Sequence, residues 1–157
     1  MPQIDPRGPQ FNAGLTSVVL IAVLLTAPGV AGVVLLALQA ALFASGALLG
    51  VQRTPAAWLF RALVRPRLAP PAHLEDPRPP RFAQAVGLAF ALVGLAGYLT
   101  GVDVLGAVAT GLALVAALLN AVFGFCLGCE MYLLGRRLTT RSTEHQHTTI
   151  EKEETSA

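Results

Sequence analysis

The sequence predicts an all-α integral membrane protein: four transmembrane helices arranged as two parallel helical-hairpin repeats, with a short amphipathic interfacial helix between them. Hydrophobic residues make up 54% of the 157 residues and charged residues only 13%, which lies outside the usual range of soluble globular proteins. Four apolar runs approach or exceed the roughly 20 residues that cross a bilayer as a helix. The runs come in two pairs, each joined by a very short turn, and a long polar connection separates the pairs.

The first hairpin is expected over residues 11–51, after a short polar N-terminal segment of residues 1–10. Its spans are Phe11 to Ala27 and Val30 to Val51, with Pro28-Gly29 as the turn. A secretory signal peptide is the competing interpretation, because small residues follow a short apolar centre. The second run starts too soon after the first to leave room for a cleavage region, so the hairpin is favoured.

The second hairpin is expected over residues 82–138, with spans at Phe82 to Thr100 and Val104 to Phe125. The tail, residues 139–157, is polar and of mixed charge, so it has no apolar surface to bury and is expected to be disordered. Neither this tail nor the proline-rich stretch from Leu68 to Pro80 suggests a soluble catalytic domain.

A short motif occurs twice and indicates an internal repeat. The segments Asp5 to Phe11 and Asp76 to Phe82 share Asp-Pro-Arg-x-Pro-x-Phe at an offset of 71 residues, each just before an odd-numbered span. Since both copies precede helices that enter from the same side, the hairpins should be parallel repeats related by a pseudo-twofold axis along the membrane normal. The prolines suit a first helical turn, and the charged residues hold the helix start at the headgroup level.

Basic residues are distributed unevenly along the chain, and the unevenness predicts topology. The connection of residues 52–81 and the segment after the fourth span are rich in arginine, whereas the two short turns have no Lys or Arg. By the positive-inside rule, this connection and both termini face the cytoplasm, in the inner or plasma membrane, and the turns face outward. The net charge of +2 is too small to indicate nucleic acid as a partner.

Within the connection, Thr54-Pro55 is a good helix start and Pro66 a good stop. Leucines on one face and Trp58 on the flank predict a short amphipathic helix in the bilayer interface, with an anchoring role. From Leu68 to Pro80 the density of prolines argues against regular structure.

The spans contain polar residues but no ionisable ones, which weighs against a proton pump or an ion-coupled carrier. The polar residues are expected to form hydrogen bonds to neighbouring helices; they are Gln39, Ser45, Thr110 and Asn120. No cofactor is expected. Glycine pairs at four-residue spacing let backbones approach closely, within the bundle or in a homo-oligomer: Gly46 and Gly50, Gly97 and Gly101, Gly124 and Gly128.

The chemistry is expected at Cys126 and Cys129, the only two cysteines of the chain, with Glu130 beside them. Two thiols three residues apart can form a disulfide with modest adjustment. The Glu130 carboxylate can accept the Cys126 proton through water, and its charge also disfavours the thiolate. At the C-terminal end of a span the helix dipole opposes a thiolate, whereas a break at Gly124 followed by a new helix would reverse this effect. The sequence leaves both arrangements open.

Three interpretations of the pair stand side by side. The thiols are redox-active, or they are two small buried hydrophobic residues, or they bind a metal with His145 and His147 of the tail as further ligands. No second cysteine pair exists to relay electrons, so an autonomous electron relay is not expected.

With these motifs in view, the chain resembles the bacterial membrane family called domain of unknown function 4395. The resemblance covers roughly Ile4 to Leu138. It rests on Asp-Pro-Arg-x-Pro-x-Phe-Asn at residues 5–12, Pro-Arg-Phe-Ala-Gln at residues 80–84 and Cys-Leu-Gly-Cys at residues 126–129. It implies a four-span protein in a setting of thioredoxin-like and rhodanese-like sulfur-handling proteins, and it provides no catalytic assignment for any residue.

Three functions follow as hypotheses. The first is a membrane-embedded partner in cytoplasm-facing thiol-disulfide or sulfur-transfer chemistry, with a soluble thioredoxin-like or rhodanese-like protein as the second partner besides the lipid bilayer. The alternative is a structural or anchoring membrane subunit with inert cysteines, and a third is a passive conduit for a small neutral solute.

Overall fold

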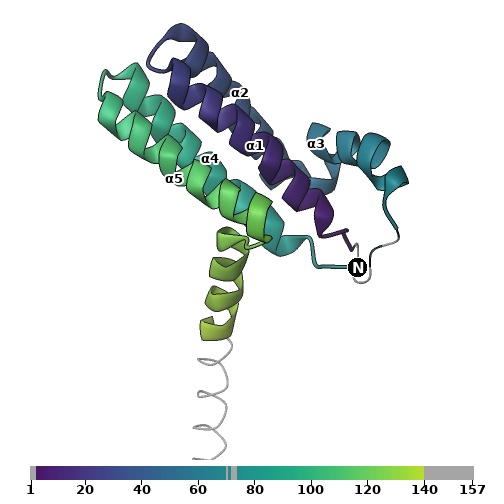
Figure 1. Cartoon of the computed structure of the whole chain (residues 1–157). Coiled ribbons are helices and arrows are strands. Elements are labelled where there is room, and N and C mark those ends of the chain that lie inside the picture. Colours follow the sequence, from purple (N-terminus) through teal and green to yellow (C-terminus); the bar gives the residue numbers. More distant parts are fainter. Residues whose placement is uncertain (1–2, 70, 72–73, 140–157) are drawn as a thin grey trace, which may run out of the picture.

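The computed structural model describes residues 3–69, 71 and 74–139, and four long helices dominate it (Figure 1). They are α1 (Arg7–Thr26), α2 (Val30–Leu49), α4 (Arg78–Leu99) and α5 (Asp103–Phe123). All four are long and apolar enough to cross a membrane, so the prediction of a multi-pass, all-helical protein with four candidate spans is confirmed for the described residues. The tail expected to be disordered lies, except for Thr139, outside the described residues.

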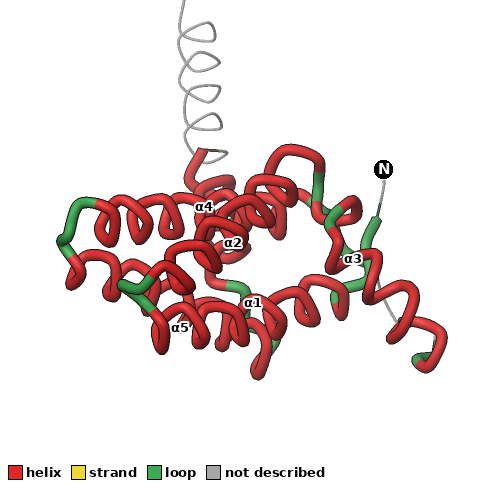
Figure 2. The backbone as a smooth tube through the Cα atoms, turned by 90° about the horizontal axis from the view of Figure 1, so that it is seen from above, coloured by secondary structure: helices red, strands yellow, loops and turns green. Residues whose placement is uncertain are grey.

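The four helices form a bundle in which each packs against two others. Helix α1 contacts α2 and α5, and α4 likewise contacts α2 and α5. Figure 2 shows α2 and α4 on one side of the bundle and α1 and α5 on the other. Leucine, valine, phenylalanine, tyrosine and alanine side chains fill the centre: Leu20, Val23, Leu36, Ala40, Phe43, Ala91, Tyr98 and Ala113. Other large apolar side chains of the spans point outward, as a bilayer requires.

Helices α1 and α4 begin earlier than the hydropathy indicates, at Arg7 and Arg78 rather than at the predicted Phe11 and Phe82. The Asp-Pro-Arg motifs therefore form the helix starts themselves, and Pro79 and Pro80 are helical, contrary to expectation. In both copies the Asp side chain accepts a hydrogen bond from the backbone N–H of the Arg two residues later, at 3.0 Å in the first copy and 2.9 Å in the second. Proline costs nothing in a first turn, where its missing N–H is not needed.

Helices α2 and α5 end earlier than predicted, at Leu49 and Phe123, because a glycine follows each in a conformation that ends the helix. Gly50 has φ 96° and Gly124 has φ 67°, in the region that residues with a Cβ rarely adopt. The apolar runs continue past both glycines, which is why hydropathy alone placed the ends at Val51 and Phe125. Both glycines terminate helices. Gly50 was expected only to serve helix packing, whereas for Gly124 a helix break was one of the arrangements left open.

The two hairpins meet at the end of the bundle where α1 and α4 start, which we call the arginine end. Just before these helices, Ile4 and Glu75 form an isolated antiparallel bridge, with N–H to O distances of 3.0 and 2.9 Å. Arg81 of α4 donates to the carbonyl of Ala47 at 2.6 Å, and Gln10 of α1 donates to the carbonyl of Ala121 at 3.1 Å. These contacts join the start of each hairpin to the end of the other.

The connection between the hairpins contains the predicted short helix, α3 (Pro55–Leu59). The Thr54 hydroxyl accepts a hydrogen bond from the N–H of Ala57 at 3.2 Å and caps the helix start. The helix continues as a π-helical turn, Phe60–Val64, and a 3-10 turn, Arg65–Arg67. The buried Phe60 ring lies 5.8 Å from the Phe11 ring of α1, so α3 is fixed against the bundle.

The polar residues at membrane depth behave in three different ways. Gln39 donates to the Thr16 hydroxyl of α1 at 3.3 Å, which confirms the expected contact between helices. Ser45 instead donates to the Leu42 carbonyl of its own helix, so the expectation is wrong there. The Thr110 hydroxyl is fully buried and has no hydrogen-bond partner within the described part of the chain.

Candidate functional site

The cysteine pair lies directly after the break that ends α5. Gly124 adopts the left-handed conformation, residues 124–126 are not helical, and a new helix covers residues 127–139. Figure 1 shows this segment leaving the bundle at a steep angle to α5. Of the two arrangements that the sequence left open, the structure has the broken one.

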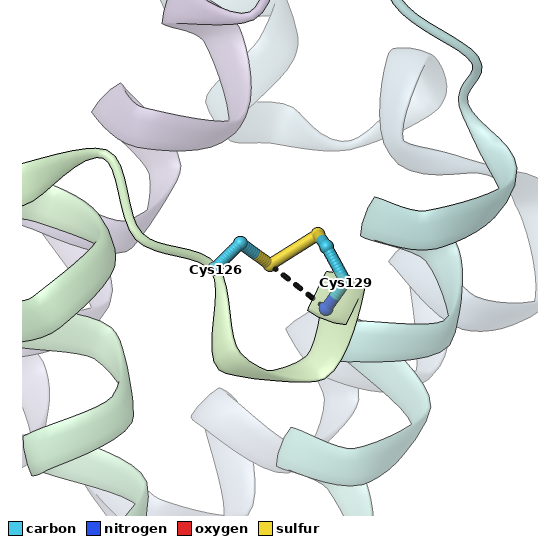
Figure 3. Close-up of a disulfide and its surroundings, with 2 residues drawn as sticks. All are labelled: Cys126 and Cys129. Carbon is cyan, nitrogen blue, oxygen red and sulfur yellow. Dashed lines mark hydrogen bonds between the residues drawn. A yellow bond between two sulfur atoms is a disulfide. The ribbon is translucent and has the colours of Figure 1, made fainter. Parts of the chain in front are cut away.

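Cys126 caps the start of the new helix (Figure 3). Its sulfur accepts a hydrogen bond from the backbone N–H of Cys129 at 3.3 Å, and its carbonyl accepts one from the N–H of Glu130 at 3.0 Å. The Cα atoms of Cys126 and Cys129 are 5.2 Å apart, and the two residues form a disulfide. Both thiol positions therefore belong to the N-terminal turn of a helix.

The position at a helix N-terminus determines which charge the site favours. Unpaired backbone N–H groups and the helix dipole make this end positive, so a thiolate at Cys126 in the reduced pair is stabilised. The N–H of Cys129 already points at the Cys126 sulfur and would hydrogen-bond to that anion. Both cysteines are half-buried, so they are sheltered without being sealed in the core.

Helix α4 holds the cysteine helix in place through a close contact with Gly128. A Cβ added at Gly128 would lie 2.7 Å from both the Cα and the Cβ of Ala83, which is closer than real Cβ atoms come. Four residues further on, the Tyr132 ring lies 5.8 Å from the Phe82 ring of α4. Only a residue without a side chain at position 128 lets the two helices approach in this way.

The variant Gly128→Ala is accordingly expected to push residues 127–139 away from α4. Overpacking of this kind costs about 1–3 kcal/mol, and part of the clash is with the α4 backbone, which cannot move aside as a flexible side chain could. Limited proteolysis and hydrogen exchange of the segment should both increase.

Gly135→Ala is the matched control, because it lies in the same helix and a Cβ there has no neighbour within 4 Å. It should leave proteolysis unchanged. Equal protection of the segment in both variants would contradict the docked arrangement.

Glu130 lies in the first turn of the new helix with its side chain exposed. A carboxylate in a first turn is favourable to the helix irrespective of the thiols. No hydrogen bond from its side chain to either sulfur is present among the described residues. His145 and His147, which the metal interpretation needs, lie outside the part of the chain that the structure describes.

Tyr132, which the sequence did not single out, completes the site. Phe82 and Ala83 were noted as part of sequence motifs before the third span, but no contact with the cysteine segment was expected for either. Phe11, the same position of the first motif, contacts Phe60 at the same distance of 5.8 Å between ring centroids. Phe60 lies six residues after the capping Thr54, and Tyr132 lies six residues after the capping Cys126.

Comparison with known proteins gives one match. The model of a family described as domain of unknown function (DUF4395) matches residues 4–137, which include all four spans and the cysteine pair. No curated protein and no solved structure matches the chain.

Proposed function

The chain belongs to the domain of unknown function 4395 family, and from this premise and the site we propose that it is a membrane-embedded partner in cytoplasm-facing thiol-disulfide or sulfur-transfer chemistry. The observation that carries the proposal is the placement of a half-buried Cys-x-x-Cys disulfide at the N-terminus of a separate helix, with Cys126 as its cap. Cys126 is the attacking thiolate and Cys129 the resolving thiol.

The proposed orientation places the arginine end in the cytoplasm, in the inner or plasma membrane. The arginines of the described residues lie in the first turns of α1 and α4, between α2 and α4, and after α5. The turns at the other end have none, which supports this orientation by the positive-inside rule. The cysteine pair follows α5 at the arginine end, so a soluble cytoplasmic protein can reach it.

We further propose that the chain is a tandem repeat whose unit is two spans plus one short helix. Ile4 and Glu75 are equivalent positions by the offset of 71 residues, and their reciprocal bridge is the kind of contact a twofold axis produces. Arg81 and Gln10 are also equivalent, and each donates to a carbonyl two residues before the end of the other hairpin's second helix. The capped short helices correspond at an offset of 72, one residue more than the helix starts, and this pairs Thr54 with Cys126 and Phe60 with Tyr132.

The proposed repeat provides an internal comparison for the cysteines. Thr54 caps α3 through the N–H of Ala57, just as Cys126 caps its helix through the N–H of Cys129. The first unit thus starts its short helix and packs it against a span without a thiol. Since Thr and Ala suffice for the structural role, the two sulfurs of the second unit are better explained by chemistry than by packing.

The exchange balances with a protein disulfide as the second reactant. The Cys126 thiolate attacks one sulfur of the partner's disulfide, forming a mixed disulfide and releasing the other partner sulfur as a thiolate. Cys129 then attacks the Cys126 sulfur, which closes the observed disulfide and releases the reduced partner. The pair is oxidised and the partner is reduced by two electrons, and the reverse reaction reduces the pair. We place Glu130 as a neighbouring carboxylate that can accept a proton through water.

Exchange with a thioredoxin-like protein tests this function. A reduced thioredoxin-like protein should reduce the disulfide of the full-length oxidised protein in lipid nanodiscs within minutes. Alkylation of the free thiols and measurement of the protein mass then show how much of the pair has been reduced. The matched control replaces both native cysteines by serine and carries Thr54→Cys with Ala57→Cys. Because of the equivalent cap, this second pair should also close with mild oxidant.

A native pair that dithiothreitol reduces but the thioredoxin-like protein does not would contradict the exchange function and favour the structural or anchoring subunit with inert cysteines. An engineered pair that stays reduced in oxidant would contradict the repeat.

A further inference from the structure

A cavity at the arginine end, separate from the cysteine pair, has the composition of a ligand site. Its volume is about 290 Å³, and it lies between the N-terminal segment, the first turn of α1, the α3 region and α4. Residues from all of these segments line it, among them Arg61, Arg65, Asn12, Gln84, Ile4 and Phe60. Neither the cysteines nor the helix that carries them contributes to it.

The cavity has a positive, polar part. Arg61 and Arg65 are one turn apart in the π-helical and 3-10 segment, and both have exposed side chains that form no ion pair within the described residues. Asp5 also lines the cavity, but one of its oxygens already accepts the N–H of Arg7 at 3.0 Å. Two guanidinium groups against one carboxylate leave a net positive charge, and the amides of Asn12 and Gln84 can donate further hydrogen bonds.

The cavity also has an apolar part, which a site for a small inorganic anion would not need. Ile4 and Phe60 are buried side chains at its wall, and Leu74 and Val51 add to it. Its volume lies near the lower end of the range of small-molecule sites, roughly 300–1,000 Å³. The space therefore suits a polar headgroup with the first apolar atoms attached to it, and is too small for a whole lipid.

The position of the cavity along the bundle indicates that such a ligand would come from the membrane. Gly8 and Pro9 of the first turn of α1 line it, so it lies where a span meets the headgroup layer. Trp58, of the adjacent helix α3, is 65% exposed, as an aromatic anchor at a bilayer interface would be. Basic pockets at this level of membrane proteins bind anionic headgroups.

We propose that this cavity binds the phosphate headgroup of an anionic membrane lipid, with Arg61 and Arg65 on the phosphate and the apolar wall against the glycerol and the start of the acyl chains. Guanidinium groups hold phosphate by paired, charge-assisted hydrogen bonds. Bound lipid would link α3 to α1 and α4.

Native mass spectrometry of the full-length protein in detergent tests the site, with phosphatidylglycerol, phosphatidylcholine of the same chains, and glycerol 3-phosphate as probes. Phosphatidylglycerol should be retained in preference to the other two. The double variant Arg61→Gln, Arg65→Gln should lower the affinity for phosphatidylglycerol about tenfold or more, because each hydrogen bond to a charged group that is lost contributes strongly to the binding free energy. The double Lys variant should bind more tightly than the double Gln variant and more weakly than the native protein, because Lys keeps the charge but not the paired hydrogen bonds.

Arg53→Gln is the matched control, because Arg53 is an exposed arginine of the same connection that does not line the cavity. Loss of binding in this variant equal to that of the double variant would overturn the site in favour of diffuse attraction. Unchanged binding in the double Gln variant, or equal retention of phosphatidylcholine, would overturn the headgroup proposal. An affinity for glycerol 3-phosphate equal to that for phosphatidylglycerol would show that the ligand is a soluble phosphate ester and not a membrane lipid, and would overturn the proposal.

Discussion

Replacing Cys129 by serine is expected to trap the protein on its partner through Cys126. Without the resolving thiol, the mixed disulfide at Cys126 cannot be displaced from within the chain, so a covalent complex should accumulate in cells. The cap contact predicts that Cys126 is the more reactive of the two cysteines, because it stabilises the Cys126 thiolate. An interaction of about 1–2 kcal/mol at a helix N-terminus corresponds to a roughly five- to thirtyfold preference for the thiolate. Non-reducing electrophoresis of the tagged protein measures the adduct.

The reverse variant, Cys126→Ser, is the matched control. Cys129 lies inside the first turn and donates its N–H to the other sulfur, so it lacks the stabilised position of the cap. The Cys126→Ser variant should therefore accumulate several times less adduct than the Cys129→Ser variant. A stronger adduct with Cys126→Ser would reverse the assigned roles, and the absence of an adduct from both variants would favour the anchoring subunit.

Substitution of Gly97 in the second hairpin is expected to lower the stability of the protein strongly. A Cβ at this position would lie 2.5 Å from the backbone N of Gly106 and 2.9 Å from its Cα, so the clash is with backbone and cannot be relieved by a rotamer change. The variant Gly97→Ala should lose about 2–3 kcal/mol of the free energy of unfolding through separation of α4 and α5. Thermal unfolding in nanodiscs measures the loss.

Gly111→Ala gives the comparison within the same hairpin. Gly111 lies in α5 with nothing within 4 Å of an added Cβ, so the substitution should be neutral or slightly stabilising by helix propensity. If the two variants unfolded at the same temperature, the close approach of α4 and α5 at Gly97 would be wrong.

The spans could be predicted because hydrophobicity alone determines which segments cross a bilayer. Their limits could not, because they depend on backbone conformation. Helices α1 and α4 start at the capped Asp-Pro-Arg motifs, in segments that are too polar for a hydropathy criterion. Helix α5 ends at Phe123, in the middle of an apolar run, and the glycine that follows was compatible with either a break or a continuing helix.

The candidate site was predictable in its residue types and not in its geometry. The spacing of Cys126 and Cys129 indicated a disulfide, but only the break at Gly124 shows that both belong to a helix N-terminus. The similarity between the helix caps at Cys126 and Thr54 could not be recognised from the sequence, because the segments 54–57 and 126–129 have no residue type in common at equivalent positions. The hydrogen bonds from backbone N–H groups to the Thr54 hydroxyl and the Cys126 sulfur, and the aromatic contacts with Phe11 and Phe82, reveal it.

Alkylation in cells tests whether the pair is a reactive dithiol that faces the cytoplasm, as we propose. A membrane-permeant maleimide should label both cysteines in growing cells, because the cytoplasm keeps an idle pair reduced. A membrane-impermeant maleimide should not label them in intact cells. It should label a cysteine placed at Val102, in the exposed turn at the other end of the bundle.

Mild oxidant should then abolish labelling of the native pair, and reductant should restore it. Labelling of Cys126 by the impermeant reagent in intact cells would contradict the orientation. Thiols that resist both reagent and oxidant until the protein is denatured would be buried packing residues, and the proposed thiol chemistry would be wrong.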